Sequence, residues 1–268
     1  MTTVQYSRRQ ILKSGLVAGV ACASLPAWSE INGINEAINK AGRQRMLSQR
    51  MAKAWLAVGQ DIESSKAESI LYDSMALFDR QFVELKSFSP NAEIKSTYTA
   101  LESVWSEYKS VLVGSSPALK TTPDLIKLDS KVLALAHQGT VQLERYSGRS
   151  VGKLVNLAGR QRMLSQRMAK YYFSNRWGAL VPDQVSELNK ARDEFKQALV
   201  TLDSAPEATA QIRQELELAS QQWVFFDNAL QRLTESTNTK KHAVEVFASS
   251  ERLLSLMDRV TGLYSRLA

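Results

Sequence analysis

Apolar residues recur at helical spacing along most of the chain. Between Ser65 and Lys86, for example, large apolar side chains stand three, four or seven residues apart, which places them on one face of an α-helix. Similar patterns predict helices over residues 31–61, 65–86, 92–113 and 124–143, and again over 151–175, 182–203, 206–235 and 240–267. Turn residues such as Ser89-Pro90-Asn91 separate them. We therefore predict an all-α protein of two tandem up-and-down four-helix bundles.

One thirteen-residue stretch occurs twice without a change. Residues 41–53 and 158–170 both read AGRQRMLSQRMAK, 117 residues apart. At the same separation, residues 54–89 match residues 171–206 at only six of thirty-six positions. A recent duplication would have left both parts alike, so the stretch indicates a specific role that both copies share.

Each copy predicts a helix that is apolar on two faces. At about 100° per residue, Leu47 and Met51 lie on one face, and Ile38 and Arg45 lie on the opposite face. A helix in a simple bundle needs only one apolar face, so the second is available to another partner. The second copy repeats this geometry with Arg162, and each copy therefore places one arginine in an apolar seam.

Small residues border both seam arginines: Ala41, Gly42 and Ser48 in one copy, and Ala158, Gly159 and Ser165 in the other. They would let the two helices approach closely and bring Arg45 and Arg162 together across a pseudo-twofold axis. Two guanidinium groups on a drying surface repel and are costly to desolvate. A small planar anion between them would cancel that cost, since the guanidinium fork matches trigonal oxygens. We therefore predict an anion-binding pair.

A structural role is the alternative. An arginine on a helix seam often extends to the surface or pairs with a carboxylate of a neighbouring helix. We expect that role for the four remaining arginines of the two copies, Arg43, Arg50, Arg160 and Arg167, which lie closer to the bundle side, and we expect the methionines to be core residues.

The repeated stretch resembles the signature of the N-terminal domain of type IV pili methyl-accepting chemotaxis transducers, the PilJ-type domain. This domain is related to the periplasmic sensor domain of nitrate/nitrite sensor kinases of the NarX type. The resemblance implies a four-helix bundle whose first helix carries the motif, with arginines of two subunits binding nitrate at a dimer interface. The ligand arginine of the motif falls on Arg45 and on Arg162. The membrane helices and the cytoplasmic output of those sensors are not apparent in this sequence.

The first 29 residues look like an export signal. Ser7-Arg8-Arg9 opens a twin-arginine-type motif, an uncharged run follows, and Ala27-Trp28-Ser29 offers a small-residue cleavage site. The apolar run is too short for a stable membrane anchor. The residues before Cys22 match a lipobox poorly, and whether Cys22 is lipidated stays open. We predict a signal peptide over 1–29, bundles over 30–147 and 148–268, and a periplasmic location.

Charge and composition narrow the function classes. The formal net charge is +7, but three basic residues lie within 1–29, so the remainder carries only +4 and no clustered basic-aromatic run, which argues against nucleic-acid binding. Cys22 is the single cysteine. His137 and His242 lack neighbours at metal-ligand spacing, and no cofactor motif is present. We predict neither an enzyme nor a metal or cofactor site.

The favoured function is binding of a small oxyanion, nitrate or nitrite first, for sensing or delivery to a membrane-bound sensor or chemoreceptor. Because both copies are in one chain, they could form internally the interface that the family makes by dimerisation; a homodimer is the alternative. The rival function is a ligand-free interaction module that uses its exposed apolar face to dock on a chemoreceptor, sensor kinase or type IV pilus component.

Overall fold

The computed structural model describes residues 31–114, 116–179, 182–234 and 239–267. These residues form eight α-helices and two short 3-10 helices, and this part of the chain contains no strand. The first four α-helices are α1 (Ile34–Gly59), α2 (Ser64–Phe88), α3 (Ala92–Gly114) and α4 (Thr122–Ser147). The second four are α5 (Ser150–Arg176), α6 (Gln184–Asp203), α7 (Ala210–Gln231) and α8 (Lys240–Ser265). The predicted all-α fold class is confirmed.

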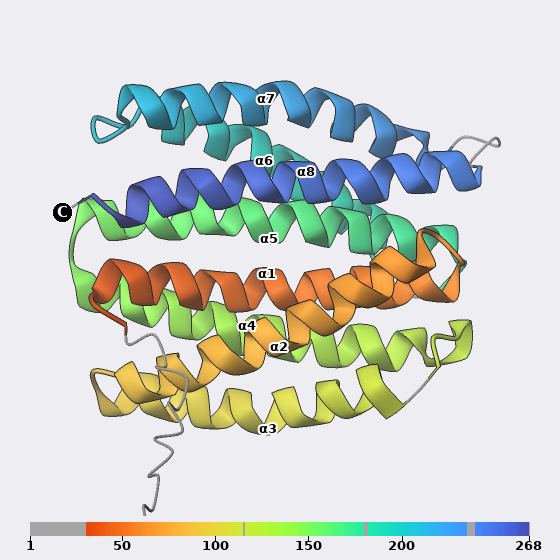
Figure 1. The fold of residues 1–268 in the computed structure, drawn as a ribbon, viewed down its shortest axis with the longest axis horizontal. Coiled ribbons are helices and arrows are strands. Elements are labelled where there is room, and N and C mark those ends of the chain that lie inside the picture. The colour runs from red at the N-terminus through yellow and green to blue at the C-terminus, as the bar shows by residue number, and fades with distance from the viewer. Residues whose placement is uncertain (1–30, 115, 180–181, 235–238, 268) are drawn as a thin grey trace, which may run out of the picture.

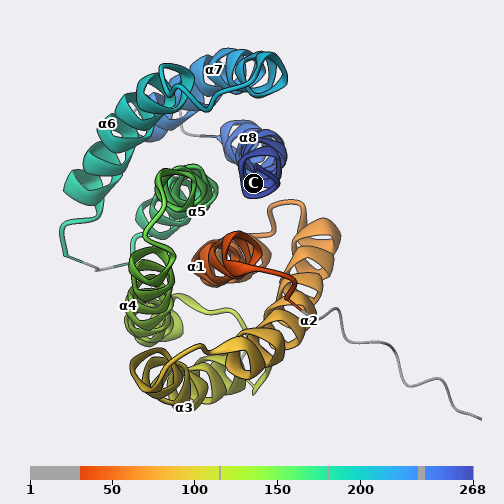
Figure 2. The same cartoon turned by 90° about the vertical axis from the view of Figure 1, so that its left-hand side faces the viewer.

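The helices alternate in direction, and α1 and α5 lie side by side at the centre of the molecule (Figure 1). Helices α2, α3 and α4 lie on one side of this pair, and α6, α7 and α8 lie on the other (Figure 2). The most extensive interhelical contact joins α1 to α5. The second apolar face of each repeated stretch is therefore buried against the other copy within the same chain. The exposed apolar face that the docking hypothesis assumed is not exposed, because the two copies cover each other.

Helices α1 and α5 run parallel, in register with the repeat. Near their beginnings, the space beside Gly152 of α5 is filled by the side chain of Ile38 of α1. Near their ends, Nε2 of Gln60 donates a hydrogen bond to the carbonyl oxygen of Phe173 at 3.0 Å. Contacts near both ends of the pair therefore lie within about one helical turn of the 117-residue register of the repeat.

The junction between α4 and α5 is a break and not a continuous helix. Helix α4 ends at Ser147, and Gly148 follows with φ 63°, the left-handed conformation that glycine adopts without strain. Gly152 instead lies inside α5, where an added Cβ would stand 2.8 Å from the hydroxyl of Ser147 and 3.2 Å from Ile38. One glycine ends a helix, and the other allows close packing.

Aromatic residues fill equivalent positions in both cores. Phe78 stacks on Trp105 with ring centroids 4.1 Å apart, and Phe195 stacks on Trp223 at 4.6 Å. All four side chains are buried. The equivalent stacked pairs therefore belong to the packed interior of each repeat.

No helix of the described residues is long and apolar enough to cross a membrane. The predicted export signal over 1–29, its cleavage site and Cys22 lie outside the described residues.

Candidate anion site

The two seam arginines meet where α1 crosses α5. The side chains of Arg45 and Arg162 are fully buried. A methyl group on Gly42 would lie 3.2 Å from Nη2 of Arg45 and 3.4 Å from Nη2 of Arg162. A methyl group on Gly159 would lie 3.2 Å from Nη2 of Arg162 and 3.7 Å from Nη2 of Arg45. Both guanidinium groups therefore lie against the same pair of glycines, and they can come this close because neither glycine has a side chain.

The other small residues of the stretch are buried as well. Ala41 and Ala158 are buried, and a Cβ on Gly42 would stand only 3.9 Å from the Cα atom of Gly159. Two further members turn back on their own helices: the hydroxyl of Ser48 donates to the carbonyl oxygen of Arg45 at 3.0 Å, and that of Ser165 to the carbonyl oxygen of Arg162 at 2.8 Å. Each hydroxyl is therefore satisfied within its own helix, and each also accepts from the following glutamine of the same copy.

One set of contacts to the arginines obeys the pseudo-twofold symmetry. Nη2 of Arg45 donates to the carbonyl oxygen of Asn156 at 3.3 Å, and Nη2 of Arg162 donates to the carbonyl oxygen of Asn39 at 3.0 Å. The two asparagines are 117 residues apart, like the arginines. Each arginine therefore reaches across the interface to the same backbone position of the other copy, and Arg45 also contacts the side-chain Oδ1 of Asn156 at 2.7 Å.

A second set of contacts breaks the symmetry. Nη1 of Arg162 lies 2.6 Å from Oδ1 of Asp258 on α8, and Nη2 of Arg43 lies 2.6 Å from the same oxygen. Nη1 of Arg45 instead lies 3.2 Å from Nδ1 of His137 on α4. Among the described residues, Arg45 takes part in no ion pair, so its charge has no direct counterion.

Burial shifts the pKa values of these groups. Desolvation, followed by the charges of Arg160 and Arg162, lowers the pKa of Arg45 to about 9. Desolvation and the neighbouring Arg43 lower the pKa of Arg162 to about 10, against the opposing effect of Asp258. Both guanidinium groups still carry a charge at neutral pH.

His137 is neutral at physiological pH. Burial, then the charges of Arg45 and Arg160, lower its pKa to about 4. Because Arg45 can only donate, Nδ1 of His137 accepts, and the ring proton lies on Nε2. The imidazole therefore contributes a dipole to the site and no charge.

The charges around the two arginines do not balance. Arg162 and Arg43 share the carboxylate of Asp258, Arg160 pairs with Glu194, and Arg45 reaches Glu144 only through the side chain of Asn156. Four guanidinium groups thus face three carboxylates, which leaves one positive charge in excess.

In addition, Nε of both Arg45 and Arg162 is buried without a hydrogen-bond acceptor among the described residues. A buried donor without an acceptor costs about 1–3 kcal/mol.

The other four arginines of the two copies are ion-pair donors, as predicted. Arg160 pairs with Glu194 and Arg167 with Glu187, both on α6 of the same repeat. The expectation that all four face their own bundle is wrong for Arg43 and Arg50, because the matching carboxylates lie on α8 of the second repeat. Arg50 contacts Glu251 at 2.5 Å.

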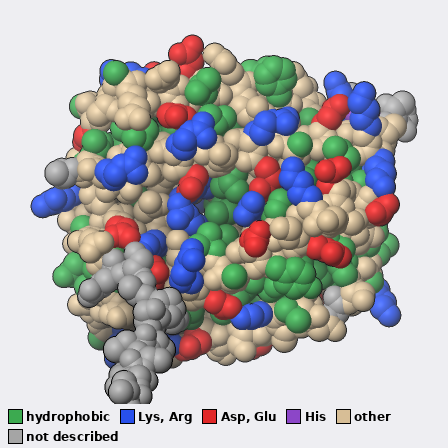
Figure 3. Space-filling model, in the orientation of Figure 1, with side chains coloured by type: hydrophobic (Ala, Val, Ile, Leu, Met, Phe, Trp, Pro, Cys, Tyr) green, Lys and Arg blue, Asp and Glu red, His purple; other side chains and the backbone are tan. Residues whose placement is uncertain are grey.

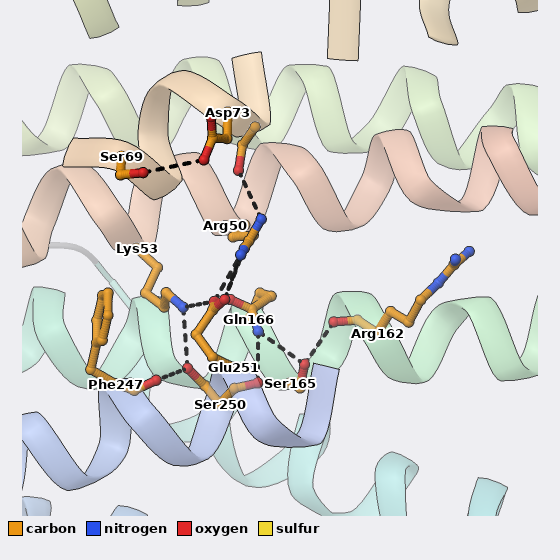
Figure 4. A network of polar contacts seen from close by, with 11 residues as sticks. Arg50, Lys53, Ser69, Asp73, Arg162, Ser165, Gln166, Phe247, Ser250 and Glu251 are labelled. Atoms are coloured by element: carbon orange, nitrogen blue, oxygen red, sulfur yellow. Dashed lines mark hydrogen bonds and ion pairs between the residues drawn. The ribbon is translucent and has the colours of Figure 1, made fainter. Parts of the chain in front are cut away.

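Buried lysines add two links between the repeats. Lys53 and Arg50 extend from α1 and meet at Glu251 of α8 (Figure 4). In the other direction, Lys170 of α5 pairs with Asp129 of α4 at 2.6 Å. On the molecular face of Figure 3, basic and acidic side chains border a hollow over α1, between α2 and α8. Charged pairs therefore connect α1 to α8, which share few direct backbone contacts.

Sequence reasoning predicted neither a role for His137 nor the contributions of Asn156 and Asp258. The asparagines could have been found, because Asn39 and Asn156 extend the repeat at the same separation. His137 and Asp258 lie on the fourth helices, where the separation of 117 residues does not align the repeats. Within the described ranges, no group of three His, Cys, Asp or Glu residues is placed to hold a metal ion.

Comparison with known proteins assigns the class. The family model described as type IV pili methyl-accepting chemotaxis transducer N-term, PilJ, matches residues 27–127 and 147–258. The chain therefore belongs to this family and contains the domain in two tandem regions. Neither the curated proteins nor the solved structures contain a match. The family is that of a chemotaxis transducer module, which supports a role in chemoreceptor signalling.

Proposed function

We propose that this protein is a sensory module that binds a small oxyanion, nitrate or nitrite first, between Arg45 and Arg162. The observation that supports the proposal is the unbalanced charge at the contact of α1 with α5. Two fully buried guanidinium groups lie against the same pair of glycines; Arg162 shares the carboxylate of Asp258 with Arg43, and Arg45 has no carboxylate in direct contact among the described residues. A monovalent anion would remove that imbalance, and its planar oxygens would suit the guanidinium forks.

Binding would act on the packing of the two repeats. The arginines lie in the interface that joins them, and each contacts the backbone of the other copy. An anion that prefers one arrangement of α1 and α5 shifts the population toward it by its difference in affinity for the two arrangements. The change would then pass to a membrane-bound partner. Export to the periplasm by residues 1–29 and kinship with NarX-type sensors remain predictions.

Calorimetric titration with sodium nitrate, nitrite and sulfate tests this proposal. We expect heat from nitrate or nitrite, and its loss in Arg45→Met and in Arg162→Met. Arg145→Ala serves as the control. The Arg145 side chain is 71% exposed, and its contact with the carboxylate of Glu93 is long, at 3.7 Å, so its loss should not disturb the fold. Circular dichroism establishes that each variant is folded. Absence of heat from every anion with the wild-type protein would refute the proposal.

A ligand-free interaction module is the second candidate, and the surface of α7 favours it. Phe225 is 66% exposed and Val224 is 54% exposed on this helix. Large apolar side chains at such exposure are suited to a protein contact. If no anion binds, and Phe225→Ser weakens association with the extracytoplasmic domain of a chemoreceptor or pilus component, this candidate replaces the first. Tyr72→Ser on α2 is the matched control.

A further inference from the structure

The fourth helices of the two repeats align at a separation different from that of the first helices. The hydroxyl of Thr140 on α4 donates to the carbonyl four residues earlier, and Thr261 on α8 does the same, both from buried positions. The repeated glutamines contact Asp129 on α4 and Ser250 on α8. Both comparisons give a separation of 121 residues. Four extra residues are about one helical turn, so equivalent faces are preserved.

This alignment makes His137 the structural counterpart of Asp258, because they too are 121 residues apart. Each lies against Nη1 of the seam arginine of its own repeat, His137 at 3.2 Å from Arg45 and Asp258 at 2.6 Å from Arg162. The pseudo-twofold symmetry of the site is therefore broken at one pair of side chains. One half contains a carboxylate, and the other contains an imidazole.

We infer that the arginine pair is functionally asymmetric: Asp258 acts as a built-in anion that closes the half at Arg162, and the external monoanion binds at the half at Arg45, with His137 as a positioning residue. This inference rests on the proposed function and specifies which half of the site takes the ligand. Asp258 already lies in direct contact with Arg162, whereas Arg45 has no carboxylate in direct contact among the described residues.

Three details support the assignment. The carboxylate of Asp258 receives donors from Arg162 and Arg43, so an external anion must compete with a short, charged contact there. The direct partners of Arg45 are neutral, His137 and Asn156, and the carboxylate of Glu144 is reached only through Asn156. Because the imidazole accepts from Arg45 through Nδ1, His137 holds the guanidinium in place without adding a negative charge that would compete with an anion.

Single substitutions at His137 and at Asp258 test the inference. His137→Asp places a carboxylate beside Arg45, as Asp258 does beside Arg162. We expect nitrate affinity in calorimetry to fall by about tenfold or more and the melting temperature without nitrate to rise. His137→Asn is the matched control of the same size without the charge, and it should retain binding. Asp258→Asn opens the second half, so its affinity or its stoichiometry should rise while its melting temperature without nitrate falls.

The outcomes separate the inference from the proposed function. If the wild-type protein binds nitrate and His137→Asp binds it equally well, the inference is wrong and the proposed function stands. Equal losses in His137→Asp and His137→Asn would assign the effect to shape and would also overturn it. If the wild-type protein binds neither nitrate nor nitrite, both are refuted.

Discussion

The ion pair between Lys170 and Asp129 should be among the most consequential charged contacts for stability. It joins α5 of the second repeat to α4 of the first, with Nζ 2.6 Å from the carboxylate. The two side chains are 1% and 0% exposed, and Asp129 also accepts from Nε2 of Gln49 at 2.8 Å. Lys170→Met would leave a buried carboxylate with one neutral donor. Loss of one partner of such a pair costs about 3–5 kcal/mol in the free energy of unfolding.

The equivalent lysine of the first copy provides the comparison. In Lys53→Met, Glu251 keeps its contact with Arg50 at 2.5 Å and is 16% exposed, so no uncompensated charge is left. We expect a smaller loss, about 1–2 kcal/mol. The two variants therefore change the same residue of the same repeated stretch. The loss in the free energy of unfolding should nevertheless be larger for Lys170→Met than for Lys53→Met, by a factor of two or more.

Urea unfolding followed by circular dichroism measures both losses. A double variant, Lys170→Met with Asp129→Asn, removes both charges and should recover part of the stability lost in the single variant. If Lys170→Met costs less than about 1 kcal/mol, or no more than Lys53→Met, the reasoning from burial and pairing is refuted.

Three further predictions concern individual groups. Burial raises the pKa of Glu251, but Lys53 and Arg50 outweigh that effect and lower it from 4.5 to about 2. Glu251 should therefore contribute a fall in the free energy of unfolding on the order of 3 kcal/mol as the pH decreases from about 4.5 to about 2, and Glu251→Gln should make the total acid-induced fall smaller by that amount. Gly42→Ala should destabilise by about 1–3 kcal/mol through crowding of the buried arginines, whereas Gly114→Ala, with open space around its Cβ, should not; equal melting temperatures would contradict this. In nuclear magnetic resonance, the ring of His137 should titrate near pH 4, and a midpoint near 6.5 would show that it does not face the arginines.

Much of the fold follows from local sequence patterns. Helix positions were predicted to within a few residues, because apolar spacing and turn residues are local properties. The largest differences are four residues: α7 begins at Ala210 and ends at Gln231 where 206–235 was predicted, and α4 ends at Ser147 where the prediction ended at 143. The close approach of the repeated stretches also followed from sequence, since small residues beside a seam arginine suit a helix contact.

The partners of each arginine could not be predicted in this way. Identical residues in the two copies have different neighbours: Arg43 pairs with Asp258 on α8, while its counterpart Arg160 pairs with Glu194 on α6. A long guanidinium side chain can reach several helices, and its choice depends on which carboxylate the packing presents. His137 escaped notice for the same reason.

The sequence by itself determined the helices, the repeat and the two-faced character of α1 and α5, because each is a regularity along one dimension. Only the tertiary structure decided that the two copies face each other within one chain, and that His137 and Asp258 occupy equivalent places. The physical reason is that the charge at the α1–α5 contact is set by side chains on α4 and α8. The packing of the helices fixes the register of these side chains relative to the arginines. This register cannot be read from the spacing of residues within a single helix.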